Sequence, residues 1–185
     1  MTEPAEVLDF WFAGDPSQRR AAWFQKDAAF DAACARFASA AEAARGGAFD
    51  HWSDTAEGAL ALLILLDQFP RNLYRGSALA FAADADARAV ASAAIARGFD
   101  RALTPVQRMF VYLPFEHSED IADQDRSVTL FEPLRAELGD TTVDYAHRHR
   151  DVIARFGRFP HRNAALGRGN TPAEEAYLAE PGSGF

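Results

Sequence analysis

The sequence predicts an all-α protein. Alanine is abundant, β-branched residues are sparse, and no segment keeps the alternation of apolar and polar residues that is typical of strands. Apolar residues with the spacing of an α-helix recur instead from one end of the chain to the other. We therefore expect roughly eight helices, joined by short connections into an antiparallel array. We expect a single domain over residues 1–185, with a flexible tail at about 180–185.

The length and charge of the chain exclude several classes of protein. With 185 residues, of which 49% are hydrophobic, it can bury a core as one globular domain. The net charge of -8 argues against nucleic acid and anionic membranes as partners, because both need a basic face. A single cysteine and the lack of an apolar run of roughly 20 residues predict a cytoplasmic protein that does not span a membrane. No motif implies a particular cofactor.

Two helices are expected in the first quarter of the chain. Thr2 can cap a first helix that ends at Phe12, with Pro4 near its start. An apolar stripe then predicts a helix over residues 27–45, ended by Gly46-Gly47. The stripe consists of Phe30, Cys34, Phe37, Ala41 and Ala44.

A central helix is expected next. Ser53 or Thr55 begins it, and it runs to about Asp67. Over residues 60–66 it is apolar on nearly every side, and it is too short to span a bilayer. We therefore expect other helices to pack around it.

The middle of the chain carries clear signals for helix starts. Asp84 or Asp86 can cap an alanine-rich helix that ends near Gly98. Thr104-Pro105-Val106-Gln107 is a capping box with proline at the first helical position. Pro114 is expected to kink or end the helix that this box begins.

Three further helices complete the expected array. Ser118 can cap the first, and Thr141 or Thr142 begins the second, which runs to Phe156. The capping box Thr171-Pro172-Ala173-Glu174 begins the last.

Three polar runs lie at proline-marked helix ends and supply a candidate site. Two of them are alike, since each has a Phe-Pro pair followed by an arginine and an asparagine. The third places an imidazole among three carboxylates just after an apolar stretch. Groups of these types, if they converge, suit a small polar or anionic ligand. The candidate binding residues are Asp67, Arg71, Asn72, Glu116, His117, Arg158, His161, Arg162 and Asn163.

Each type of side chain would have its own role in this site. The arginines would orient the ligand, and the asparagines would add neutral donors and acceptors. Glu116 would position His117. The spacing of Asp67 and Arg71 suits an ion pair on one helix face.

Three alternatives to ligand binding remain open. One is a hydrolase-type enzyme in which His117 is the general base and Glu116 its orienting partner. Another is a peptide-binding scaffold with a long open groove. The third is a structural network of ion pairs between helix ends.

A metal site is not expected. Glu119 and Asp120 can simply complement the positive end of a helix, and His149 lies on an apolar face typical of a core histidine.

Four motifs carry a resemblance to a known family. They are Leu8-Asp9-Phe10-Trp11-Phe12, Leu66-Asp67-Gln68-Phe69-Pro70-Arg71-Asn72, Leu113-Pro114-Phe115-Glu116-His117-Ser118-Glu119-Asp120 and Arg155-Phe156-Gly157-Arg158-Phe159-Pro160-His161-Arg162-Asn163. With these, essentially the whole chain resembles the bacterial family catalogued as domain of unknown function 924. The resemblance implies a helical fold of the tetratricopeptide-like class in a soluble protein. It implies no reaction, so no catalytic residue is transferred from it.

Overall fold

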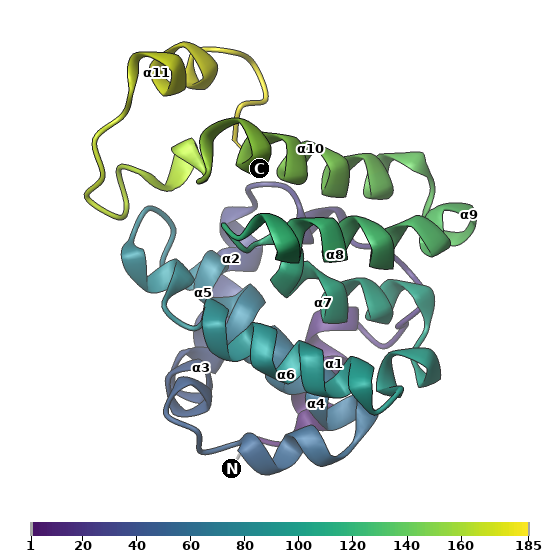
Figure 1. Cartoon of the computed structure of the whole chain (residues 1–185). Helices are drawn as coiled ribbons and strands as arrows, with labels where there is room; N and C mark the ends of the chain where they lie inside the picture. The colour runs from purple at the N-terminus through teal and green to yellow at the C-terminus, as the bar shows by residue number, and fades with distance from the viewer. Residues whose placement is uncertain (1, 185) are drawn as a thin grey trace.

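The structure, a computed structural model, describes residues 2–184, and these residues form helices and turns without any strand (Figure 1). The predicted all-α class is therefore confirmed, and the helices form one compact domain. The flexible tail at about 180–185 stays a prediction, and residue 185 lies outside the described residues. The α-helices are α1 (Pro4–Phe12), α2 (Ala28–Cys34), α3 (Ala38–Arg45), α4 (Ala56–Leu63), α5 (Phe69–Leu73), α6 (Asp84–Ala96), α7 (Pro105–Glu116), α8 (Ile121–Phe131), α9 (Arg135–Leu138), α10 (Asp140–Phe156) and α11 (Pro172–Leu178).

Three of the expected helices contain a local change in winding. The helix expected over residues 27–45 consists of α2, a 3-10 turn at Ala35–Phe37 and α3. The central helix consists of α4, a π-helical segment at Ile64–Gln68 and α5. A 3-10 turn at Glu132–Leu134 separates α8 from α9. Followed through these changes, the helices of the described residues match the roughly eight that were expected.

Side-chain caps explain several helix starts. Thr55, and not Ser53, caps α4, because its hydroxyl accepts a hydrogen bond of 3.1 Å from the N–H of Gly58. The N-cap of α1 is Glu3, which makes no side-chain bond, so the cap expected at Thr2 is wrong. Both predicted capping boxes, at α7 and at α11, are confirmed.

The junction after Pro114 differs from the expectation. Pro114 lies inside α7, and the helix continues through it to Glu116. A proline removes one backbone donor from a helix, but its fixed φ angle is compatible with helical backbone. The cap of α8 is Asp120 and not Ser118, because the Asp120 carboxylate accepts from the N–H of Ala122 at 2.7 Å. Capping of α8 therefore explains Asp120 without a role in the candidate site.

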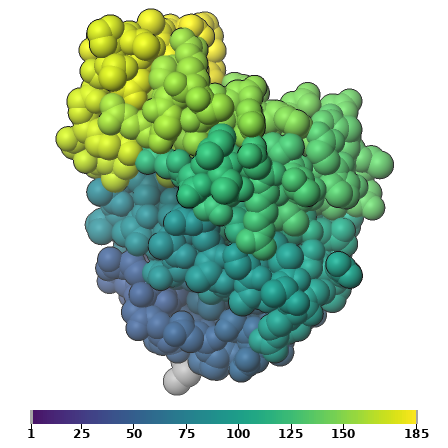
Figure 2. Space-filling view, viewed as in Figure 1, coloured from purple at the N-terminus to yellow at the C-terminus, as the bar shows by residue number. Residues whose placement is uncertain are grey.

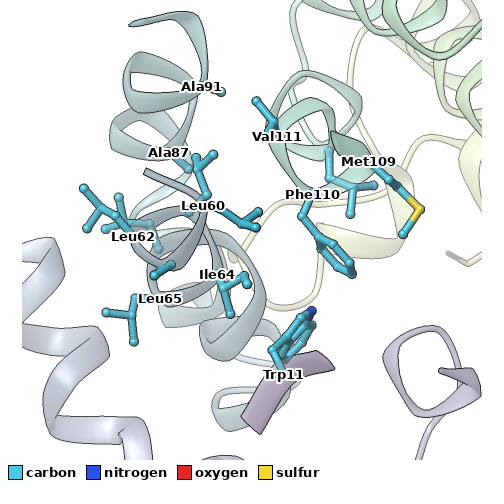
Figure 3. Close-up of a cluster of buried hydrophobic side chains, with 14 of the residues drawn as sticks. Trp11, Leu60, Leu62, Ile64, Leu65, Ala87, Ala91, Met109, Phe110 and Val111 are labelled. Carbon is cyan, nitrogen blue, oxygen red and sulfur yellow. The ribbon is translucent and has the colours of Figure 1, made fainter. Parts of the chain in front are cut away.

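The central position expected for α4 is confirmed. Every side chain from Leu60 to Leu66 is at most 2% exposed. Figure 3 shows several of them beside Ala87 and Ala91 of α6 and beside Phe110 of α7. Small alanine side chains allow α6 to approach the central helix closely. The π-helical segment thus continues a helix that is enclosed on all sides.

An aromatic cluster holds α1 to this centre. Trp11 is fully buried, and its ring centroid lies 5.3–5.9 Å from those of Trp23, Phe30, Phe69 and Phe110. These rings come from five different segments, so one side chain ties the N-terminal part of the chain to α2, α5 and α7.

The outer helices complete the arrangement. α7, α8 and α10 pack side by side in successive rows (Figure 1). The segment that contains α11, drawn in yellow, protrudes beyond this body in Figure 2.

The remaining predictions on the fold have different outcomes. α10 begins at Asp140, and not at Thr141 or Thr142. No helix within residues 2–184 is both long enough and apolar enough to cross a membrane. The tetratricopeptide-like arrangement implied by the resemblance stays a prediction.

Candidate functional site

The candidate site begins at the π-helical segment of the central helix. In this segment the N–H of Phe69 donates to the carbonyl of Ile64, five residues earlier, so the turn is wider than in an α-helix. Asp67 lies in this wider turn, and it is only 1% exposed. Single π-helical turns within α-helices occur frequently at functional sites. A buried carboxylate there must be paired or hydrogen-bonded.

The Asp67 carboxylate has three polar partners. Its Oδ1 lies 2.8 Å from Nδ1 of His117 and 3.1 Å from Nη1 of Arg71. Its Oδ2 accepts from the amide of Gln68 at 2.5 Å. Burial alone would raise the pKa of Asp67, but the charge of Arg71 and the contact with His117 outweigh it and lower this pKa below 3.8. Asp67 is therefore ionised, and the predicted pair with Arg71 is present.

His117 follows the last residue of α7 and is partly open to solvent, with 15% of its side chain exposed. Burial and the charge of Arg71 lower its pKa below 6.5, although Asp67 acts in the opposite direction. The ring is therefore neutral at neutral pH, and Nδ1–H donates to Asp67. Within residues 2–184, Nε2 of His117 has no protein hydrogen-bond partner. The outer nitrogen thus keeps a lone pair that can accept a hydrogen bond or a proton.

Two arginines share one carboxylate next to this pair. Arg71 donates to Asp84 through two hydrogen bonds, of 2.9 and 3.0 Å. Arg162 reaches the same carboxylate through Nη1 at 3.4 Å. Asp84 is the first residue of α6, whose N-cap is Ala83, so Asp84 serves the arginines and does not cap the helix. Asp84 thereby links α5, α6 and the 3-10 turn Pro160–Arg162.

Arg162 is held between aromatic rings. Its Cζ lies 4.5 Å from the ring centroid of Phe81 and 4.5 Å from that of Phe159. Burial and the neighbouring charge of Arg71 lower the pKa of Arg162 to about 10. The guanidinium is still charged at neutral pH, in a position where water does little to stabilise it.

Glu116 belongs to a different pair. Its Oε1 lies 3.3 Å from Nδ1 of His149, and both side chains are buried. His149, expected as a core histidine, also contacts the carbonyl of Tyr145 through Nδ1 at 2.8 Å. The structure therefore gives His117 the partner Asp67 in place of the predicted Glu116. Burial, with a contribution from Asp67, raises the pKa of Glu116 to about 8, so Glu116 is protonated at neutral pH.

Replacing Glu116 with Gln is expected to remove part of the pH dependence of stability. The carboxyl has a pKa of about 8 in the folded protein and 4.5 as its ordinary value. Between these pH values the folded state keeps a proton that the unfolded state releases, so stability falls as pH rises through this window. Glutamine does not titrate, and Glu116→Gln should therefore be more stable than the wild type at pH 8.5 and close to it at pH 5. Urea denaturation at several pH values measures this.

An exposed glutamate provides the control for this experiment. Glu137 of α9 is exposed, and Glu137→Gln should keep the pH profile of the wild type. If Glu116→Gln keeps that profile as well, Glu116 does not hold a proton in the folded state at neutral pH.

Three of the predicted site residues are engaged elsewhere. The amide of Asn72 donates to Asp31 of α2 at 2.7 Å. Arg158 binds Glu174 of α11 through two hydrogen bonds, of 2.6 and 2.9 Å. Asn163 is fully buried, and its side chain bonds to the loop that follows it. These three residues hold neighbouring segments together and do not face His117.

His161 and the loop after α10 border the site. The ring centroid of His161 lies 5.4 Å from that of Phe159, and burial together with Arg162 lowers the pKa of His161 to about 4. Arg168 of the same loop binds Glu119 through two hydrogen bonds, of 2.7 and 2.9 Å. Glu119 therefore anchors this loop to the segment before α8. Its main contact is the pair with Arg168, and not the helix end that was expected.

The structure thus brings together six of the nine candidates: Asp67, Arg71, Glu116, His117, His161 and Arg162. It adds three residues that the motifs do not contain or assign to the site: Phe81, Asp84 and His149. Phe81 had no sequence signal, whereas Asp84 stood out as an acidic residue at a helix start and His149 as a histidine on an apolar face, and a helix cap and a core histidine explain these signals equally well. Among the described residues, no group of three or more His, Cys, Asp or Glu side chains is arranged to hold a metal ion.

The fold and the site define the protein as an all-α protein that encloses a polar cluster with two aspartates, two arginines and one partly exposed histidine. The chain belongs to the family described as bacterial protein of unknown function (DUF924), whose family model matches residues 7–182. It is also similar to a solved structure of a protein of unknown function from Agrobacterium tumefaciens, with 47% sequence identity, a TM-score of 0.86 and coverage of 95% of this chain and 96% of that chain. A comparison with curated proteins gave no match.

Proposed function

We propose that the partly exposed edge of this cluster, formed by Arg71 and His117, binds a small polar or anionic ligand. The observation that carries the proposal is the contact between Asp67 and His117. A buried carboxylate fixes Nδ1 of the imidazole at 2.8 Å, and Nε2 is left on a side chain that is 15% exposed. A network that only joined helices would not need this open acceptor.

The neighbouring charges support the same proposal. Arg71 lies 3.1 Å from Asp67 and has 19% of its side chain exposed, so its guanidinium borders the same edge. An arginine beside a neutral imidazole offers a ligand one charged donor and one acceptor. Ligands with an acidic or hydroxyl group next to an oxyanion meet both requirements.

A second candidate is a hydrolase-type enzyme that uses the same pair. A carboxylate that holds an imidazole through Nδ1 leaves Nε2 placed to accept a proton from a water molecule or a hydroxyl group. In this candidate His117 is the general base, and Asp67 takes the orienting role first expected for Glu116. Among the described residues, no contact of the cluster favours the expectation of a peptide-binding groove. The cytoplasmic location also remains our proposal, based on the single cysteine.

Thermal unfolding of the whole protein with a panel of small carboxylates, phosphates and polyols tests the proposal. At least one compound should raise the Tm, and His117→Gln should remove that shift while the variant keeps the helical circular dichroism of the wild type. His147→Gln is the matched control, because His147 is 43% exposed and pairs with Glu132 on the surface. If no compound raises the Tm, or if the shift persists in His117→Gln, the proposal is wrong.

The same panel separates a binding protein from an enzyme. A compound that stabilises the protein and remains intact on incubation supports binding alone. A compound that is consumed by the wild type and not by His117→Gln supports the hydrolase-type candidate.

A further inference from the structure

Arg162 is a buried cation with an incomplete set of hydrogen bonds. Its side chain is only 7% exposed, and Phe81 and Phe159 lie close to the guanidinium. Aromatic rings stack on a guanidinium without occupying its N–H groups, which point outward in its plane. Nε of Arg162 is buried and has no hydrogen-bond partner among the described residues.

Among residues 2–184, the one carboxylate within hydrogen-bonding distance of Arg162 is that of Asp84, which is already paired with Arg71. Arg71 holds both oxygens of Asp84 at 2.9 and 3.0 Å, whereas Arg162 reaches one of them at 3.4 Å. Charge-assisted hydrogen bonds between a guanidinium and a carboxylate are usually about 2.7–2.9 Å long. Asp84 is therefore the primary partner of Arg71 and only a weak partner of Arg162.

An unpaired donor in this position is costly. Leaving a buried N–H without an acceptor costs about 1–3 kcal/mol, and more when the group is charged. Burial and the charge of Arg71 also lower the pKa of Arg162, because too few acceptors stabilise its positive charge. An acceptor that approaches in the plane of the guanidinium would remove this cost.

The charges of the cluster select the class of acceptor. Asp67 and Asp84 balance Arg71 and Arg162, while Glu116 is protonated at neutral pH. A ligand with two negative charges would therefore add two uncompensated negative charges to a buried site, whereas a singly charged ligand would add only one. A planar carboxylate also matches the fork of a guanidinium.

We propose that Arg162 anchors a carboxylate subsite, in which its Nε–H and a neighbouring N–H hold the monoanionic carboxylate of the ligand that reaches the site past Arg71 and His117. This inference rests on the proposed function, because it names the chemical class of the ligand for that site.

The test uses ¹H–¹⁵N NMR spectra of the arginine Nε–H groups in the full-length protein. Sodium acetate is the probe, and sodium phosphate and sodium chloride at matched ionic strength are the comparison ions. The Arg162 signal is assigned by its loss in Arg162→Lys. Acetate should shift this signal saturably, and phosphate and chloride should not.

Two variants define the expected effect. Arg162→Lys keeps the charge but loses the planar fork, so the apparent acetate affinity, followed through the imidazole signals of His117, should fall about tenfold or more. Arg150→Gln is the control, because Arg150 pairs with Asp125 on the surface with 39% of its side chain exposed, and the affinity should stay unchanged.

The outcomes distinguish this inference from the proposed function. A shift at His117 without a shift at Arg162, or an equal response to phosphate, would overturn the carboxylate subsite and leave the binding site at His117 in place. If none of the three salts shifts the Arg162 signal saturably, then only an ordered water molecule satisfies Nε of Arg162, and the inference fails. If, in addition, no compound of the panel affects His117, the proposed function fails as well.

Discussion

Asp67→Asn is expected to destabilise the protein by about 3–5 kcal/mol, the usual cost of removing one partner from a buried ion pair. Asp67 is 1% exposed, and its carboxylate forms an ion pair with Arg71 at 3.1 Å and a hydrogen bond with His117 at 2.8 Å. Asparagine would remove the negative charge that compensates Arg71, and its NH2 group would replace one oxygen that now faces a donor, at Gln68 or at His117 and Arg71. Arg71 would keep Asp84 as a partner but would lose its nearest negative charge on the central helix. Chemical denaturation monitored by circular dichroism measures the change in unfolding free energy.

A surface carboxylate serves as the control for this variant. Asp125 pairs with Arg150 and has 58% of its side chain exposed, so Asp125→Asn should cost about 1 kcal/mol or less. Equal effects at both positions would contradict the central role assigned to Asp67.

The same residue gives the wild type an acid-sensitive component of stability. The pKa of Asp67 in the folded protein is lowered below its ordinary value of 3.8, because Arg71 and His117 outweigh the effect of burial. The contribution of Asp67 is therefore fully present above this ordinary value and is lost as pH falls below it. This acid-dependent loss should be absent in Asp67→Asn.

Trp11→Ala is expected to have a similarly large effect, about 3–5 kcal/mol. Trp11 is fully buried, and its ring contacts four aromatic rings from other segments of the chain. Its removal would leave a large cavity between α1, α5 and α7. Equilibrium unfolding in guanidinium chloride measures the loss.

Two further variants separate cavity formation from other causes. Trp11→Phe should cost clearly less than Trp11→Ala, because it keeps most of the ring and removes an indole N–H that is buried without a hydrogen-bond partner in the described residues. Phe24→Ala, at a side chain that is 49% exposed, should cost about 1 kcal/mol or less. A cost for Phe24→Ala as large as that for Trp11→Ala would contradict the packing described for α1.

The features that were predictable from the sequence are local ones. The two capping boxes are four-residue patterns whose hydrogen bonds form within one turn, and both are present. The pair of Asp67 and Arg71 follows from a spacing of four residues on a helix, and it is present as well. The burial of α4 follows from its uniform apolar composition.

The partners of the polar residues were less predictable, because tertiary packing decides them. Asp67 and Glu116 were both candidates near His117, and the π-helical turn of a helix distant in sequence places Asp67 against the imidazole. Two similar motifs suggested similar roles for Asn72 and Asn163. Each amide instead bonds to a polar group of its own surroundings, in α2 for the first and in the following loop for the second.

The bond between Arg162 and Asp84 joins residues that are 78 positions apart, and the pair of Glu119 and Arg168 spans 49 positions. During synthesis the apolar centre around α4 can begin to collapse while the chain is still growing, since domains tend to fold from the N-terminal side. The polar edge cannot close until nearly the whole polypeptide has been made. A protein truncated before residue 160 would therefore leave Asp84 with Arg71 but without Arg162, and Glu119 without Arg168.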